Sequence, residues 1–285
     1  MRIIILGARG RLGLALSKEF SPGNEVIAWD SVDLDITAET QVKEKLLALR
    51  PEVVINAAAY NAVDKIEENE VDYVLAEKVN GQALKYLAQV CNELDSILVH
   101  YSSEYVFAGD NKEGYVEAAE TSPVNKYGET KLLGEKMVQV EAKKYYLIRL
   151  SRLFGPMEQS AMSKKSFVGI MLDLVEKKGK TELDLVAEGM SCPTYSLDLA
   201  KLTNQLLIGK QSFGIYHGAN SGSCNWYEFA QEIFKIKGLE VKCNPVSAEN
   251  FSYPAKRPKY AELINTKLSK QRIWQEALAE YLLIS

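Results

Sequence analysis

A tyrosine and a lysine stand four residues apart in the stretch Tyr127–Lys131. On a helix this spacing places both side chains on one face, one turn apart. A phenol with a pKa of about 10 is a weak acid–base catalyst at neutral pH, and a neighbouring ammonium group lowers its pKa toward the working range. Ser103 follows the apolar run Ile97–Val99 and can donate a hydrogen bond to the same substrate oxygen. We therefore interpret Ser103, Tyr127 and Lys131 as candidate catalytic residues.

The chain opens with a glycine-rich turn between an apolar strand and a helix. Gly7, Gly10 and Gly13 follow the run Arg2–Leu6. Glycines in this context permit a tight turn, let a phosphate approach the main chain and allow close helix packing, and the helix N-terminus then holds the pyrophosphate. The three candidate catalytic residues also have ordinary explanations, as an interfacial aromatic, a solvated charge and a strand-end cap. Their combination with the glycine turn favours a nicotinamide-dependent enzyme.

Two features of the sequence point to different nicotinamide cofactors. Asp30 follows the glycine turn by about 20 residues, where a carboxylate accepts hydrogen bonds from the adenosine ribose and repels a 2'-phosphate, which favours NADH. Arg9 and Arg11 lie in the turn, and a guanidinium there can pair with that phosphate, which favours NADPH. The residues leave the choice between NADPH and NADH open.

Strands and helices alternate along the first half of the chain. Apolar runs recur at Glu25–Trp29, Val53–Ile55, Ile97–Val99 and Tyr145–Leu150, and the segments between them have helical periodicity, as in Val71–Asn92. This alternation predicts an α/β fold with a Rossmann-type, doubly wound parallel sheet.

A hydroxyl-bearing pair followed by proline, Thr121-Ser122-Pro123, predicts the start of the helix that carries Tyr127. Gly128, beside the tyrosine, predicts that another main-chain segment or a ligand approaches the helix closely.

The pattern loosens after Leu150, at Gly155-Pro156 and the polar stretch Glu158–Lys165. We expect residues 1–152 to form a dinucleotide-binding domain. Return elements near 196–217 belong to it, where a helix and a strand are predicted. Residues 153–195 and 218–285 then form a smaller C-terminal α/β domain that binds the substrate.

Composition limits the partners. The 285 residues have a formal net charge of −4 and no dense run of lysine or arginine, so we expect no nucleic-acid partner. Four cysteines lie far apart and only two histidines are present, so we expect no metal site. No apolar run reaches the ~20 residues that span a bilayer, and a strand begins almost at the N-terminus. We therefore expect no membrane partner, no cleavable signal and a cytoplasmic location.

Over nearly its whole length the sequence resembles the dTDP-4-dehydrorhamnose reductase family, within the extended short-chain dehydrogenases/reductases. The G-x-x-G-x-x-G form of the first turn is typical of short-chain dehydrogenases. The motifs that carry the resemblance lie at residues 7–13, 33–37, 54–64, 102–107, 127–135, 192–194, 214–217, 226–230 and 255–258.

The resemblance implies reduction of the 4-keto group of dTDP-4-dehydro-L-rhamnose, with hydride from NADPH or NADH. Tyr127 would protonate the forming alkoxide, Lys131 would hold the nicotinamide ribose, and Ser103 would orient the ketone. The cofactor-binding residues it implies are Gly7, Gly10, Arg11, Leu12, Gly13, Asp30, Asp35, Ile36, Ala59, Tyr60, Asn61, Tyr101, Tyr127 and Lys131. The substrate-binding residues it implies are Ser103, Glu104, Arg152 and Arg257.

Some of these positions have a competing interpretation. Asp35 and Ile36 can be a loop acid and a core aliphatic residue, and Arg257 can form a surface ion pair. The sequence also departs from the family pattern. Serine and glutamate stand at 103 and 104 in place of threonine and aspartate, and Arg152 replaces a tryptophan expected near the substrate.

Two further departures are Asn61, which replaces a usual threonine, and Ala15, where some members have a carboxylate that binds magnesium. The family's asparagine–phenylalanine pair is represented only by Ser166-Phe167, after an atypical stretch from Pro156. We expect no such magnesium site.

Two alternative functions remain open. Glu104 and Arg152 are compatible with a reductase or epimerase of another nucleotide-linked keto-sugar. A non-catalytic regulatory subunit that binds a dinucleotide, like the β subunit of methionine adenosyltransferase, is the other alternative, and the intact catalytic residues argue against it. The expected ligand in the first two cases is a small nucleotide sugar. A homodimer is possible.

Overall fold

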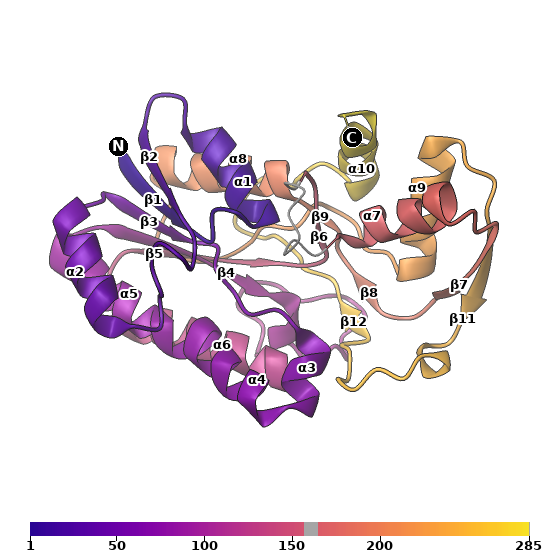
Figure 1. The fold of residues 1–285 in the computed structure, drawn as a ribbon, viewed down its shortest axis with the longest axis horizontal. Coiled ribbons are helices and arrows are strands. Elements are labelled where there is room, and N and C mark those ends of the chain that lie inside the picture. Colours follow the sequence, from indigo (N-terminus) through magenta and orange to yellow (C-terminus); the bar gives the residue numbers. More distant parts are fainter. Residues whose placement is uncertain (157–164, 285) are drawn as a thin grey trace.

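The computed structural model describes residues 1–156 and 165–284, and its centre is a parallel sheet of six strands (Figure 1). The spatial order is β10-β5-β4-β3-β1-β2. The strands span Arg2–Leu6 (β1), Glu25–Trp29 (β2), Val53–Asn56 (β3), Ile97–Ser103 (β4), Tyr145–Leu150 (β5) and Gly214–His217 (β10). The predicted α/β fold with a doubly wound parallel sheet is confirmed. The order reverses at β1, so a ligand site is expected outside the carboxyl ends of β1 and β3.

Helices cover both faces of the sheet (Figure 1). On one face lie α1 (Arg11–Phe20) and α8 (Ser196–Ile208), which pack on each other and on the apolar side chains of β1 and β3. On the other face lie α2 (Glu39–Leu49), α5 (Ala83–Leu94) and α6 (Lys126–Glu141). Burial on both faces explains why β1, β3 and β5 are almost continuously apolar.

The predicted helix over 71–92 is more complex than its periodicity indicates. It comprises α4 (Glu70–Ala76), a π-helical segment (Glu77–Gln82) and α5, and α3 (Val63–Glu68) precedes it. The π-helical segment packs closely on α6, since a Cβ on Gly81 would lie 2.5 Å from Leu133 Cδ2. Its Asn80 is fully buried and donates to Thr130 Oγ1 on α6, at 3.0 Å.

The helix that carries Tyr127 begins later than predicted. Its N-cap is Asn125, whose Oδ1 accepts from the main-chain N–H of Gly128 at 2.8 Å, so the predicted start at Thr121–Pro123 is wrong. Asn125 Nδ2 donates to Lys256 O, and this contact with a distant loop selects it as the cap. The predicted close approach at Gly128 is confirmed, because a Cβ there would lie 2.3 Å from Tyr105 O.

The C-terminal elements surround a separate core that includes Phe229 and Trp274. Its helices are α7 (Phe167–Leu172), which continues into a π-helical turn (Asp173–Lys177), α9 (Trp226–Lys237) and α10 (Trp274–Ile284). Three short parallel pairs join β6 (Leu153–Phe154) to β9 (Thr194–Tyr195), β7 (Glu182–Val186) to β11 (Lys242–Val246), and β8 (Met190–Ser191) to β12 (Tyr260–Ala261). Two short 3₁₀ turns span Glu104–Val106 and Ala248–Asn250. Most of the polar stretch 158–165 lies outside the described residues.

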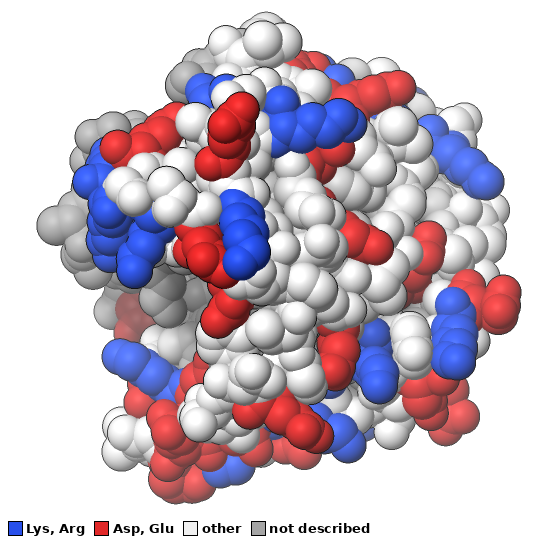
Figure 2. Space-filling view, turned by 90° about the vertical axis from the view of Figure 1, so that its right-hand side faces the viewer, with Lys and Arg blue, Asp and Glu red and all other residues white. Residues whose placement is uncertain are grey.

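The surface over the C-terminal elements carries acidic and basic side chains that alternate, without an extended area of one sign (Figure 2). Within residues 1–156 and 165–284, no helix combines the length and the apolar character that crossing a bilayer requires.

A buried ion pair joins the sheet to α6. Arg149 on β5 donates from Nε and Nη2 to the two carboxylate oxygens of Glu135, at 2.9 and 2.7 Å, and both side chains are at most 2% exposed. Arg149 Nη1 also donates to Glu117 O at 3.1 Å, and the guanidinium lies 4.9 Å from the centre of the Phe107 ring. Removal of either Arg149 or Glu135 would leave the charge of the other buried and unpaired.

We predict that Arg149→Met and Glu135→Leu each lower the free energy of unfolding by about 3–5 kcal/mol. The double variant recovers most of that loss, because neither charge remains. Urea unfolding followed by circular dichroism measures both effects. Lys242→Met, which breaks the exposed pair with Glu182, is the control and changes the stability far less. Single variants as stable as the wild type would contradict the role of this pair.

Candidate active site

The glycine turn lies between β1 and α1, at the carboxyl edge of the sheet. Gly7 has a φ of +75°, and a Cβ there would lie 2.7 Å from Ala58 N. A Cβ on Gly13 would lie 2.2 Å from Gly7 O, whereas one on Gly10 would meet only Gly7 O, at 3.2 Å. Within the described residues, α1 starts without a side-chain cap or an acidic residue in its first turn. The turn therefore fits a pyrophosphate bound by main-chain N–H groups.

The arginines of the turn differ in their surroundings. Arg9 is exposed, while Arg11 Nε donates to Gly155 O at 3.2 Å and connects α1 to the chain just after β6. Leu12 is buried in the core, so only its main chain can face a ligand.

The carboxylates after β2 organise their own loop. Asp30 is half-buried, and its Oδ1 accepts from Ser31 N at 2.7 Å. Asp35 is exposed, and its Oδ1 accepts from the main-chain N–H and the hydroxyl of Thr37, at 2.9 and 2.7 Å. Ile36 is 6% exposed and packs in the core beneath α2, in agreement with the competing interpretation of this residue.

The segment after β3 is held by Asn80. The amide of Asn80 accepts from Tyr60 N at 2.8 Å and donates to Tyr60 O at 2.9 Å, and the Tyr60 hydroxyl donates to Asp72. Ala59 and Asn61, on either side of Tyr60, are both exposed.

Ser103 is the last residue of β4 and is 8% exposed. Its hydroxyl donates to Glu104 Oε2 at 2.6 Å and accepts from Tyr105 N at 3.3 Å. Glu104 is only 5% exposed, and burial raises the pKa of its carboxyl above the usual value, while Ser103, Ser151 and Arg152 act in the opposite direction. The structure therefore joins Ser103 and Glu104 into one polar group at the strand end.

Tyr127 lies against this group from α6. Burial, followed by Glu104 and Tyr105, raises the pKa of Tyr127 above its usual value, and a hydrogen bond with Ser103 lowers it. The Tyr105 ring packs edge-on against the Tyr127 ring, with centroids 5.3 Å apart. Tyr127 is therefore a neutral phenol at neutral pH, the form that gives up a proton.

Lys131 lies one helical turn beyond Tyr127 and is 2% exposed. Its Nζ donates to Tyr101 O at 2.7 Å and lies 3.3 Å from His100 Nε2. Burial lowers the pKa of Lys131 to about 8, although Glu135 acts in the opposite direction. The expectation that Lys131 lowers the pKa of Tyr127 is not met, because the amine is directed toward β4. Tyr101 contributes a carbonyl here, and its hydroxyl is hydrogen-bonded to Thr203.

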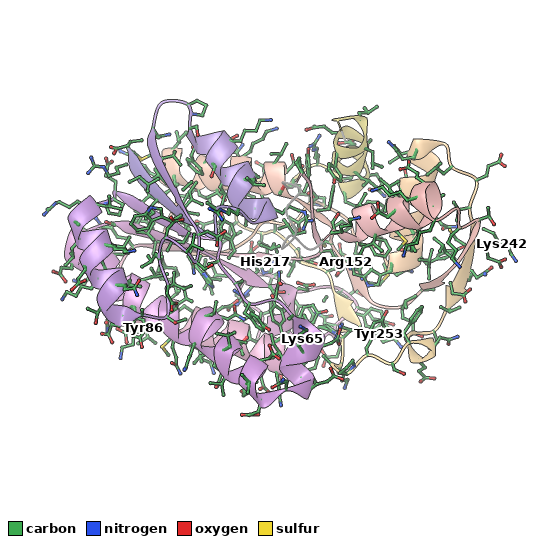
Figure 3. The ribbon with its side chains drawn as sticks, in the orientation of Figure 1. Lys65, Tyr86, Arg152, His217, Lys242 and Tyr253 are labelled. Carbon is green, nitrogen blue, oxygen red and sulfur yellow. The ribbon has the colours of Figure 1, made fainter. Side chains whose placement is uncertain are left out.

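The two predicted substrate arginines have different partners. Arg152 has a φ of +41° and lies near the centre of the molecule (Figure 3). Its Nη1 donates to Cys224 O at 2.7 Å, its Nη2 donates to Gly189 O, and its guanidinium is 4.0 Å from the centre of the Trp226 ring. Arg257 Nη2 instead donates to both carboxylate oxygens of Asp64, at 2.9 and 2.8 Å, and this ion pair agrees with the competing interpretation.

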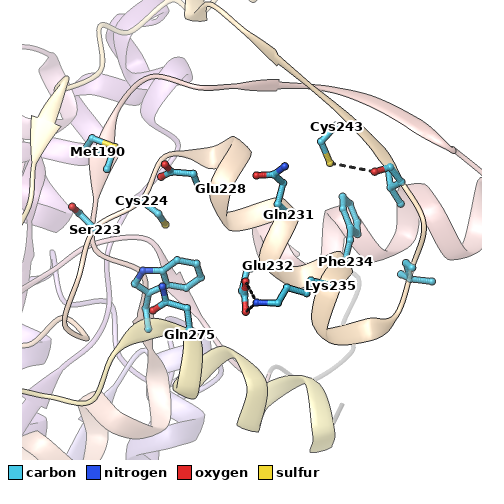
Figure 4. A pocket seen from close by; sticks show the side chains of 13 residues that line it. Met190, Ser223, Cys224, Glu228, Gln231, Glu232, Phe234, Lys235, Cys243 and Gln275 are labelled. Carbon is cyan, nitrogen blue, oxygen red and sulfur yellow. Dashed lines mark hydrogen bonds and ion pairs between the residues drawn. The ribbon is translucent and has the colours of Figure 1, made fainter.

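A cavity of about 740 Å³ lies elsewhere, lined mainly by residues of α9, the start of α10 and Cys243 of β11 (Figure 4). None of the predicted site residues lines it. Three of the polar side chains that line it have partners of their own: Glu228 caps α9 with Asn225, and Glu232 pairs with Lys235. We therefore place the active site by the geometry of the catalytic residues.

No cluster of three or more His, Cys, Asp or Glu side chains suited to a metal ion is present among the described residues. The four cysteines are free thiols.

Two residues near Lys131 were missed by sequence reasoning. His100 and Asn56 are both buried, are paired in register across β4 and β3, and contact each other through Asn56 Nδ2 and His100 Nδ1, at 3.3 Å. The available signal was a polar residue at the end of each apolar run, at the sheet edge where the glycine turn also lies.

Comparison with known proteins identifies the family of this chain. Residues 1–284 match the sequence model of the RmlD substrate binding domain. The dTDP-4-dehydrorhamnose reductase of Escherichia coli K12 is 32% identical, over 95% of this chain and 91% of that protein. The crystal structure of a dTDP-4-dehydrorhamnose reductase from Clostridium acetobutylicum is 39% identical, with a TM-score of 0.92 over 100% of this chain and 99% of that one.

A second solved structure, the dTDP-4-dehydrorhamnose reductase of Bacillus anthracis in complex with NADP, is 34% identical. Its TM-score is also 0.92, over 100% of this chain and 99% of that one. The match to the family model covers more than half of the chain, and the curated relative is aligned over most of its length. The chain therefore belongs to the RmlD substrate binding domain family, which includes the dTDP-4-dehydrorhamnose reductases.

Proposed function

We propose that this protein reduces the 4-keto group of dTDP-4-dehydro-L-rhamnose to give dTDP-L-rhamnose, with NADPH or NADH as reductant. The observation that carries the proposal is the convergence of Ser103, Tyr127 and Lys131, all buried, at the carboxyl edge of the sheet. The named relatives and the NADP complex of one of them point to the same reaction class.

A reduced nicotinamide held at this edge of the sheet would supply a hydride to the carbonyl carbon. The protein's own groups manage the charge that forms on the oxygen. Tyr127 is a neutral phenol and transfers its proton to that oxygen. The Ser103 hydroxyl turns its proton from Glu104 toward the carbonyl and orients it. Lys131 holds the nicotinamide ribose from the next turn of α6.

The cofactor is held along the edge of the sheet in this proposal. The N–H groups of the turn Gly7–Gly13 bind the pyrophosphate, and Asp30, Asp35 and Ile36 lie at the adenosine end. Ala59, Tyr60, Asn61 and the main chain of Tyr101 complete the site toward the nicotinamide. The exposure of Ala59 and Asn61 supports this arrangement.

The proposal also assigns the dinucleotide and the substrate to different domains. Residues 1–152, with 196–217, bind the dinucleotide, and residues 153–195 and 218–285 bind the substrate. The separate apolar core of the C-terminal elements supports it. Glu104 and Arg152 face the sugar nucleotide from the boundary, and Arg257 acts there only when its pair with Asp64 opens.

We propose that the protein acts in the cytoplasm and that it forms a homodimer. The homodimer is supported by α4, where Val71, Val74 and Leu75 share one helix face and are 77%, 39% and 41% exposed. Sedimentation velocity distinguishes the dimer from the monomer.

We predict that Tyr127→Phe lowers kcat about a hundredfold to ten-thousandfold, because the variant lacks the proton donor. The assay mixes the protein with NADPH, then NADH, and enzymatically generated dTDP-4-dehydro-L-rhamnose, and follows the loss of nicotinamide absorbance. Tyr105→Phe removes a neighbouring phenol that is not the donor and reduces kcat far less. Dinucleotide binding without turnover by the wild type would favour another keto-sugar or a regulatory role.

Ser103→Ala should lower kcat about a hundredfold, since one hydrogen-bond donor to the developing charge is lost. Ser102→Ala is the matched control, because the adjacent Ser102 hydroxyl is buried without a hydrogen-bond partner in the described part of the chain. The same absorbance assay compares the two variants. Equal kcat values for both would remove Ser103 from the mechanism.

A further inference from the structure

An ion pair joins two segments that lie far apart in the chain, α3 and the segment before β12. Arg257 Nη2 donates to both carboxylate oxygens of Asp64, at 2.9 and 2.8 Å, and Arg257 Nη1 donates to Ala255 O at 2.8 Å. The side chains of Arg257 and Asp64 are 32% and 40% exposed, so solutes can reach the pair. An exposed pair of this kind contributes little stability and can exchange one partner for another.

The pair occupies the part of the guanidinium that a phosphate group needs. A guanidinium presents parallel N–H groups along two edges, one formed by Nε and Nη2 and the other by Nη1 and Nη2. Nη2 belongs to both edges, and both contacts of Arg257 Nη2 go to Asp64. While the pair is closed, neither edge can bind a phosphate through two parallel hydrogen bonds. A ligand must therefore displace Asp64 to use this guanidinium fully.

The main chain on either side of Arg257 is anchored independently of its guanidinium. On one side, Lys256 O accepts from Nδ2 of Asn125, the N-cap of α6, at 2.6 Å. On the other side, Tyr260 N donates to Gly109 O at 2.8 Å. The guanidinium can therefore leave its carboxylate partner by side-chain rotation alone, and the segment stays in place.

Arg257 is one of two guanidiniums near the end of the catalytic strand. Burial, followed by Glu104, raises the pKa of Tyr105 to about 12, while the charges of Arg257 and Arg152 act in the opposite direction. The Tyr105 ring packs against the catalytic Tyr127. Both arginines thus lie within electrostatic reach of a residue that contacts the catalytic phenol. A ligand with two negative charges close together, such as a diphosphate, matches this arrangement.

We propose that Asp64 is a positioning residue that acts through Arg257: its carboxylate holds the guanidinium in the free protein, and the diphosphate of a nucleotide-linked sugar binds by displacing it. This inference rests on the proposed function, in which the substrate is a sugar of this class. The carboxylate takes the guanidinium back when the ligand leaves.

This exchange weakens the binding of substrate and product alike, because both carry the same diphosphate. The opening of the pair subtracts from the affinity of every ligand that uses Arg257. It leaves the chemistry at the ketone unchanged, since neither Asp64 nor Arg257 meets the reacting atoms in this proposal. Removal of the Asp64 charge should therefore lower KM without raising kcat.

Isothermal titration calorimetry with dTDP measures the binding of the diphosphate without turnover. Asp64→Asn keeps an oxygen for Ala255 N and removes the charge, so the Kd of dTDP should fall about twofold to fivefold, as expected for an exposed ion pair. Asp64→Glu keeps the charge and should retain the wild-type Kd. Glu68→Gln removes the same charge from an exposed position on α3 and should change the Kd little at about 0.15 M salt, where distant charges are screened.

A double-mutant cycle shows whether the effect acts through Arg257. Arg257→Met should raise the Kd of dTDP about tenfold, because charge-assisted hydrogen bonds to the phosphate are lost. Asp64→Asn in the Arg257→Met background should bring no gain, because no guanidinium remains to be released. An equal gain in both backgrounds would overturn the proposal, and so would weaker dTDP binding by Asp64→Asn. If circular dichroism shows that Asp64→Asn does not fold, Asp64→Ser makes the same test.

Steady-state kinetics separates this inference from the reductase assignment. With dTDP-4-dehydro-L-rhamnose in the absorbance assay, Asp64→Asn should lower KM by the same factor as the Kd of dTDP and leave kcat no higher than that of the wild type. A merely structural role of Asp64 would instead lower kcat and raise KM. The expected dTDP cycle without turnover would reject the sugar and retain the exchange at Arg257. Turnover without coupling in the cycle would retain the reductase and reject the exchange.

Discussion

The close packing of α6 against its neighbours is the constraint on which the site depends. A Cβ on Gly128 would lie 2.3 Å from Tyr105 O, and one on Gly134 would lie 2.1 Å from Asn80 O. Glycine at these two positions lets the helix approach both the end of β4 and the π-helical segment. Tyr127 immediately precedes Gly128 and Lys131 lies between the two glycines, so the same approach brings the phenol to Ser103 and the amine to the Tyr101 carbonyl.

The buried ionisable side chains of α6, Glu135 and Lys131, differ in their partners. Glu135 and Arg149 neutralise each other through two hydrogen bonds, as a buried pair must to avoid a desolvated charge. Lys131 has no carboxylate of its own within this arrangement, because the acid one turn away is already occupied. Its contacts are a carbonyl and an imidazole, which stabilise an ammonium less than a carboxylate does, and burial lowers its pKa to about 8.

The catalytic serine, Ser103, has an acidic neighbour. Glu104 is enclosed beside Ser103, and Arg152 lies close enough to favour its charged form, although burial outweighs that effect. Arg152 adopts a left-handed main-chain conformation and stacks on Trp226. Its guanidinium is held by two carbonyls of the C-terminal elements, so this residue links the catalytic strand end to the second core. A displacement of Arg152 would therefore affect Ser103 through Glu104.

The sequence by itself determined the features that depend on local geometry. Alternating strand and helix periodicities indicated the parallel sheet, the glycines after β1 indicated the turn, and the four-residue spacing placed Tyr127 and Lys131 on one face. Tertiary structure decided the contacts between segments far apart in the chain. Asn125 caps α6 where it meets Lys256, Arg257 reaches Asp64, and His100 meets Lys131 through strand register and helix packing. Local periodicity says which face a side chain occupies, but the partner across that face depends on how distant segments pack together.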